Sequence, residues 1–186
     1  MKFVAFLLVI ALMLSGCGQA EDAMNRAMAL RGRLLGGQGS AFDAIITADY
    51  SDTIYTFEVR CKTDRQGNLE FQVLKPEPIE DISGTISAQG GKLTFDDVGL
   101  AFDLLADGQV SPVCGPWLMM KALQGGYVRS SGMEDGLVRL TIDDSYHADA
   151  LQVDIWLGTD DLPVRAEVLF RQRRILSLEV SNYEIL

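Results

Sequence analysis

Histidine and cysteine are scarce in this chain: 186 residues include one histidine, His147, and three cysteines. A lone histidine cannot supply the spaced set of ligands that a structural or catalytic zinc ion needs. The sequence also lacks the G-x-S-x-G turn of a serine hydrolase, although Ser145 and several aspartates lie near His147. We therefore expect His147 to be a solvated loop residue, and we expect a protein that is not an enzyme and uses no cofactor.

Calcium-loop spacing is also missing, because the acidic pairs Asp96-Asp97, Asp143-Asp144 and Asp160-Asp161 do not form a D-x-D-x-D-G pattern. These pairs are typical of solvated turns at strand ends. A carboxylate pair for glycoside hydrolysis stays open, since the separation of two carboxylates is not visible in a sequence.

Basic residues are fewer than acidic residues in this chain. The chain has 16 Lys and Arg against 26 Asp and Glu, which gives a formal net charge of −10. This balance argues against nucleic-acid binding, which needs a basic face. It also predicts that the domain stands off an anionic lipid surface. One basic cluster, Arg171-Gln172-Arg173-Arg174, is predicted at a hairpin tip, as a solvated turn or as a contact for lipid headgroups or an acidic partner.

The N-terminus carries the most specific signal. Lys2 precedes an apolar run from Phe3 to Leu14, which is too short to span a membrane, and the run ends in Leu14-Ser15-Gly16-Cys17. The segment resembles a bacterial lipoprotein signal. The resemblance implies that residues 1–16 are removed and that Cys17 carries acyl chains such as palmitate. It places the protein in the cell membrane or outer membrane, with the domain outside the cytoplasm.

Two cysteines remain after lipidation, Cys61 and Cys114. In an exported protein they either form a disulfide or serve as small buried apolar residues, and the sequence leaves both alternatives open. The stretch Cys114-Gly115-Pro116-Trp117 lacks the second cysteine of a thioredoxin-type redox site.

Hydrophobic periodicity predicts one domain, residues 23–186, preceded by a lipidated tether over residues 17–22. A helix is expected over residues 20–35, with an apolar stripe made of Met24, Ala27, Met28, Leu30 and Leu34. Pro116 begins a short helical insert. Elsewhere the period is two. Strands are expected over residues 42–50, 55–62, 69–73, 82–88, 92–96, 100–104, 127–131, 137–143, 151–158, 164–172 and 175–183.

The connections between these strands are too short for parallel crossovers. We therefore predict a mainly β (α+β) fold: a single curled antiparallel sheet of about eleven strands, arranged as a meander that forms an incomplete barrel. The N-terminal helix and the helical insert are expected to cover its concave apolar face.

This order of elements resembles the LolA/LolB superfamily of lipoprotein carriers, and also the germination lipoproteins of clostridia. The strand and loop Phe71 to Glu77 followed by Ile82-Ser83-Gly84, and the end of the chain from Leu162, carry the resemblance. It implies a half-barrel that holds a hydrophobic ligand. LolB-like acceptors also have a protruding loop with an apolar tip, for which Ile79, between Pro76 and Asp81, is the nearest candidate.

Two functions follow from this sequence. The first is a membrane-anchored module that binds an acyl chain or a lipidated peptide in the half-barrel cavity. The second is a structural platform for another envelope protein. A third, a hydrolase, has no nucleophile or metal set to support it. For the first function, the residues expected to line the cavity are Tyr55, Phe57, Phe71, Phe95, Phe102 and Trp117, which would otherwise be ordinary core.

The lipobox makes a direct prediction about covalent structure. Intact-mass analysis of the native product should show a chain that begins at Cys17 and carries acyl groups on it. An unmodified Cys17 sulfur in the native protein would contradict the assignment.

Overall fold

The computed structural model describes residues 20–95, 98–103, 105–106, 109–143 and 151–186. An N-terminal helix occupies residues 20–36. The first half of the chain then contains β1 (Gly39–Asp49), β2 (Ile54–Asp64), β3 (Leu69–Lys75), η1 (Glu77–Ile79), β4 (Ser83–Ser87), β5 (Gly90–Phe95), β6 (Val98–Phe102), β7 (Leu105–Ala106) and β8 (Gln109–Val110). The second half contains η2 (Pro112–Cys114), α2 (Gly115–Gly125), β9 (Tyr127–Glu134), β10 (Leu137–Asp143), β11 (Gln152–Leu157), β12 (Pro163–Phe170) and β13 (Arg173–Ile185).

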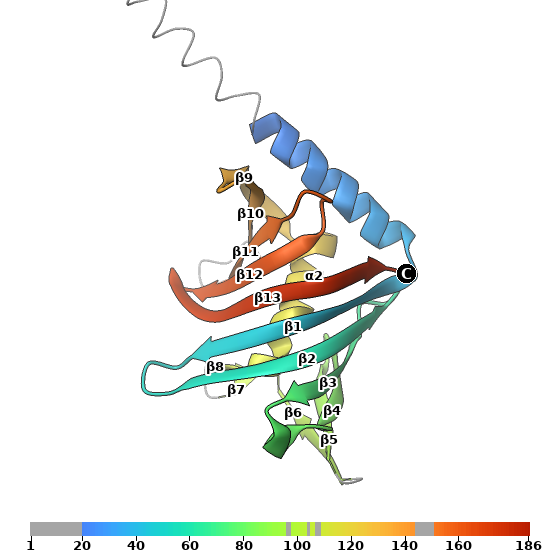
Figure 1. The fold of residues 1–186 in the computed structure, drawn as a ribbon, viewed down its shortest axis with the longest axis vertical. Helices are drawn as coiled ribbons and strands as arrows, with labels where there is room; N and C mark the ends of the chain where they lie inside the picture. Colours follow the sequence, from blue (N-terminus) through green and yellow to red (C-terminus); the bar gives the residue numbers. More distant parts are fainter. Residues whose placement is uncertain (1–19, 96–97, 104, 107–108, 144–150) are drawn as a thin grey trace, which may run out of the picture.

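Eleven strands form one open antiparallel sheet in the order β6-β5-β4-β3-β2-β1-β13-β12-β11-β10-β9, and β7 pairs with β8 (Figure 1). The predicted mainly β fold with a single eleven-stranded sheet is confirmed. The predicted single meander is wrong. The sheet consists of two meanders: the first is formed by β1–β6 and the second by β9–β13. The chain leaves the sheet after β6 and re-enters at the opposite edge as β9, so that the last strand, β13, pairs with the first, β1.

The seam between the two meanders is the pairing of β1 with β13. Ile46 lies opposite Leu178, and Ala44 lies opposite Val180. All four side chains are buried on one face of the sheet, which we call the inner face. Since directly opposed residues point to the same face, this pairing joins the apolar faces of both meanders into one surface.

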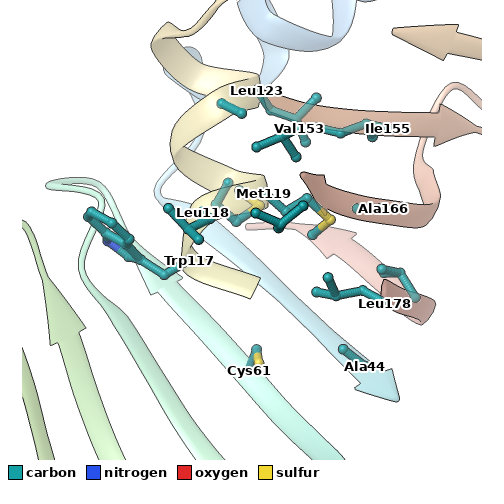
Figure 2. Close-up of a cluster of buried hydrophobic side chains, with 14 of the residues drawn as sticks. Ala44, Cys61, Trp117, Leu118, Met119, Leu123, Val153, Ile155, Ala166 and Leu178 are labelled. Atoms are coloured by element: carbon teal, nitrogen blue, oxygen red, sulfur yellow. The ribbon is translucent and has the colours of Figure 1, made fainter. Parts of the chain in front are cut away.

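Helix α2 packs against the inner face (Figure 2). Pro116 suits its first turn, where a backbone N–H has no helical acceptor, and the helix ends before Gly126. Met119 and Leu123 are buried against strands of the second meander, and Leu118 is buried on the side of the helix that faces the first. A Cβ added to Gly115 would lie 3.3 Å from the Leu178 side chain, so the start of α2 approaches β13 closely.

The N-terminal helix buries Ala23, Ala27, Leu30 and Leu34. Of the predicted stripe, Met28 is exposed, and Ala23 takes the buried place expected for Met24. Residues 20–22, expected in the tether, belong to this helix. The Arg31 guanidinium donates hydrogen bonds to the carbonyl oxygens of Leu123 (2.7 Å) and Gly126 (2.8 Å) at the end of α2. A cation at that end is favourable because the last carbonyls of a helix have no helical donors. The two helices are therefore fixed to each other.

Packing under α2 can be tested with two methionines. Met119 is a fully buried side chain of α2. Met119→Ala should lower the free energy of unfolding by about 2–5 kcal/mol, because a cavity remains. The matched control is Met133→Ala, since Met133 is 42% exposed on β9. The control should change the free energy of unfolding by less than about 0.5 kcal/mol, as most surface substitutions do. Urea denaturation of the Cys17→Ser protein measures both, and equal effects would contradict the described core.

Candidate functional site

The space between α2 and the sheet is filled by side chains. Phe57 and Trp117, two of the residues expected to line a cavity, are buried in this core. The Trp117 indole N–H donates to the carbonyl oxygen of Gly67 (3.0 Å), which joins the first turn of α2 to the β2–β3 turn. Figure 2 shows Trp117 and Leu118 on the side of α2 that faces the first meander. The region beneath the helix is therefore core.

Exposed apolar side chains gather at the other end of the inner face, on β5 and β6. Leu93 lies opposite both Gly84 and Leu100, and Phe95 lies opposite Val98. The exposed fractions are 48% for Phe95, 59% for Val98 and 63% for Leu100. We call the set Leu93, Phe95, Val98, Leu100 and Phe102 the apolar wing. It is continuous with the core but open to solvent.

Two glycines allow aromatic rings to lie close against the backbone at the base of the apolar wing. A Cβ added to Gly91 would lie 2.1 Å from the Phe102 ring, and one added to Gly84 would lie 2.8 Å from the Phe71 ring. Both rings therefore cover the backbone of a neighbouring strand, which only a residue without a side chain permits. Phe71 is buried and Phe102 is half-buried.

The six residues predicted to line a cavity thus fall into three groups. Phe57, Phe71 and Trp117 are core, and Phe95 and Phe102 belong to the apolar wing. Tyr55 is exposed at the start of β2, where its ring meets that of Tyr50 edge-on at 6.1 Å. Val98 and Leu100, the most exposed members of the wing, were missed by the sequence interpretation, although the alternation in Val-Gly-Leu-Ala-Phe gives the signal.

Cys61 and Cys114 are both free and both buried. This arrangement corresponds to the second of the two alternatives open at the level of sequence, that of small apolar core residues. Burial raises the pKa of the Cys114 thiol to about 12, although a hydrogen bond with Ser111 opposes the shift. Burial, followed by the charge of Asp43, raises the pKa of the Cys61 thiol far above its ordinary value. Both thiols are therefore unreactive in the folded protein.

Polar residues that the sequence marks as candidates, in the acidic pair at Asp160-Asp161 and in the basic cluster, form structural contacts. Asp161 accepts a 2.5 Å hydrogen bond from Arg26, which ties the β11–β12 turn to the N-terminal helix. In the basic cluster, Arg173 pairs with Asp49 and Arg174 with Glu167. Among the residues that the structure describes, no three His, Cys, Asp or Glu side chains gather to hold a metal. Cys17, Asp96-Asp97, Asp144 and His147 lie outside those residues.

Ile79 does not form a protruding apolar tip, because its side chain packs partly buried against the core. Two hollows at the surface are lined mostly by polar residues. One of about 460 Å³ is lined largely by polar side chains such as Lys62 and Glu70, and another of about 480 Å³ by Ser130, Ser131 and Arg139. Within the described ranges, no helix has the length and apolarity needed to cross a bilayer. The apolar wing is therefore the candidate site for a hydrophobic ligand.

Comparison with known proteins gives matches in structure alone; no family model and no curated protein matches the chain. An outer membrane lipoprotein-sorting protein domain from Vibrio parahaemolyticus has a TM-score of 0.48 and 12% identity, over 89% of this chain and 93% of that one. A LolA superfamily protein from Nitrosomonas europaea has a TM-score of 0.45 and 8% identity, over 86% and 93%. LprF from Mycobacterium bovis has a TM-score of 0.43 and 13% identity, over 89% and 94%. The chain is similar to LolA-like proteins. The likeness is one of fold, and the function is argued below from the residues.

The raised pKa of Cys114 predicts a loss of stability in alkali. The ordinary value is 9.0 and the folded value about 12, so the unfolded chain loses its proton first as the pH rises. Stability from this thiol is complete below the unfolded pKa and declines as the pH rises toward the folded one, by about 1.4 kcal/mol per pH unit.

Cys114→Ala removes this contribution. Between pH 8 and 10.5 the free energy of unfolding of Cys17→Ser protein should fall by about 2 kcal/mol more than that of the Cys17→Ser/Cys114→Ala variant. Urea titrations at each pH measure the difference. Parallel pH profiles would show that the thiol is not buried as described.

Proposed function

We propose that this chain is a non-enzymatic lipoprotein of the cell envelope, anchored through acyl chains on Cys17, and that its domain holds an acyl chain on the apolar wing. The ligand is a free lipid or the acyl chain of a lipidated peptide, which share this chemistry. The observation that carries the proposal is the exposure of Phe95, Val98 and Leu100 in a continuous apolar strip. Such a strip is unusual on an acidic surface unless something covers it.

The dimensions of the wing suit an acyl chain. Strand β5 has six residues and β6 has five. Since a strand rises about 3.3 Å per residue, the strip is roughly 20 Å long. An extended acyl chain of the kind carried by lipoproteins has a comparable length. Burial of about ten methylene groups would contribute about 8 kcal/mol, which corresponds to a dissociation constant in the micromolar range.

The side chains beside the strip leave room for a polar headgroup. Lys92 and Asp103 are exposed next to the wing, while its inner face carries only apolar groups. A ligand lying along β6 would keep its acyl chain on Leu93, Val98 and Leu100 and its headgroup in water. Selectivity would therefore come from the hydrocarbon rather than from the headgroup.

A second candidate is a platform for an envelope protein, and the free edge of β6 favours it. Of the described strands, none pairs with the outer edge of β6, and its sequence Val-Gly-Leu-Ala-Phe has no charge or proline to discourage pairing. An extended segment of a partner would add as a further strand. Lipid and protein occupants are distinguished by what co-purifies.

The wing can be tested by substitution at its two most exposed residues. Val98→Ser/Leu100→Ser in Cys17→Ser protein should raise the dissociation constant of a fluorescent fatty acid at least about tenfold, because the contact with the hydrocarbon is lost. Ile45→Ser is the matched control, since Ile45 is 42% exposed on the opposite face of β1. The affinity of the Ile45→Ser variant for the fatty acid should equal that of the Cys17→Ser parent.

Equal affinities of the wing variant and the control, with unchanged melting temperatures, would overturn the acyl-chain proposal. Mass spectrometry of lipids extracted from the purified parent supplies the second readout. A stoichiometric protein partner without bound lipid would favour the platform instead.

A further inference from the structure

The N-terminal helix is fixed to the domain at three places along its length. At its start, the Ser131 hydroxyl of β9 donates to the carbonyl oxygen of Ala20 (3.2 Å). In its middle, Arg26 donates to the Asp161 carboxylate (2.5 Å) and to the Gly158 carbonyl oxygen (3.2 Å). Further on, Arg31 binds the end of α2. The helix is thus part of the rigid body, and the chain enters that body beside β9.

The tether that remains is very short, because Ala20 is the third residue after the expected lipid attachment at Cys17. An extended chain spans at most about 3.6 Å per residue, so the start of the helix stays within roughly 11 Å of the acylated residue. This step rests on the proposed lipid anchor.

We infer that this tether holds edge strand β9 against the anchoring bilayer and that the apolar wing points away from it. The exposed side chains two residues on either side of Ser131 are Arg129 and Met133. A cationic and an apolar side chain suit the headgroup layer of a bilayer. The exposed acidic residues Glu21, Asp22 and Asp135 oppose close approach, in line with the expectation from the net charge that the domain stands off an anionic surface. Insertion of two or three whole acyl chains outweighs a few surface charges, because every buried methylene adds to the membrane affinity.

The apolar wing lies at the far edge of the same sheet. Strands β9 and β6 are the two edge strands of the eleven. Neighbouring strands lie about 4.8 Å apart, so the two edges are separated by roughly 50 Å along the curved sheet. Figure 1 shows the start of the helix and β9 at one end of the long axis and β4, β5 and β6 toward the other. An acyl chain on the wing must therefore arrive from the aqueous side, carried by another protein or presented by an opposing membrane.

Fluorescence quenching in vesicles tests this orientation. Arg129→Cys and Lys92→Cys, each in the lipidated full protein, place a fluorophore on β9 and on the outer face of β5. Cys61 and Cys114 remain unlabelled because they are buried and their thiol pKa values are raised. With lipids spin-labelled at the headgroup, quenching at position 129 should exceed that at position 92 at least threefold.

Flotation of the protein together with the vesicles shows that it is anchored. If anchored protein gives equal quenching at both positions, or stronger quenching at position 92, the proposed orientation alone is overturned. Failure to float, with an unmodified Cys17 in the mass spectrum, would overturn the proposed anchor and the orientation with it. The two failures are therefore distinguishable.

A lengthened tether is the matched control. Insertion of about twenty Gly and Ser residues after Gly18 gives a flexible chain with a root-mean-square length of about 25 Å. The difference in quenching between positions 129 and 92 should then fall by at least half. A difference that persists undiminished would show that the short tether does not set the orientation.

Discussion

Burial of α2 against the second meander determines which part of the inner face of the sheet is core and which part is exposed. The curled sheet presents an apolar surface across all its strands, but the helix covers it over β10–β13 and the adjoining seam. Met119 and Leu123 fill that part, so it is core rather than cavity. The apolar side chains of β5 and β6, in contrast, are largely exposed. One short helix thus makes the two ends of the sheet different.

This asymmetry gives each end of the sheet its own role. At the β9 edge, Arg26 and Arg31 join the N-terminal helix to the β11–β12 turn and to the end of α2, so the part nearest the proposed anchor is held by several contacts. At the β6 edge, the strands are short and their apolar side chains are open. A hydrophobic ligand needs such an open surface, and a lipid anchor needs a firm connection to the domain. The proposed function places the two requirements at opposite edges.

Periodicity in the sequence predicted the strands because buried and less buried residues alternate along most of them, as in β1, β3 and β10. Val138, Leu140 and Ile142 in β10 are buried as the pattern predicts. The pairing of β1 with β13 could not be predicted in this way, since alternation tells which face a residue takes and not which strand lies beside it. The split into two meanders depends on that long-range choice.

The candidate site was predicted in part for the same reason. Alternation placed Phe57, Phe71, Phe95 and Phe102 on one face. Their exposure depends on where α2 lies, and a sequence does not give that position. Phe57 lies within the core, whereas Phe95 lies beyond it. Val98 and Leu100 are aliphatic members of the same strip, whereas the six residues predicted to line a cavity are all aromatic, and Val98 precedes the strand expected over residues 100–104.

The central claim, that an acyl chain lies along β5 and β6, is tested most directly by methyl NMR with a spin-labelled fatty acid. The account predicts selective broadening of the methyl resonances of Leu93, Val98 and Leu100, while those of Ile45 on the outer face stay sharp. Broadening confined to Leu118 and Leu123 under α2, or no selective broadening at all, would contradict it.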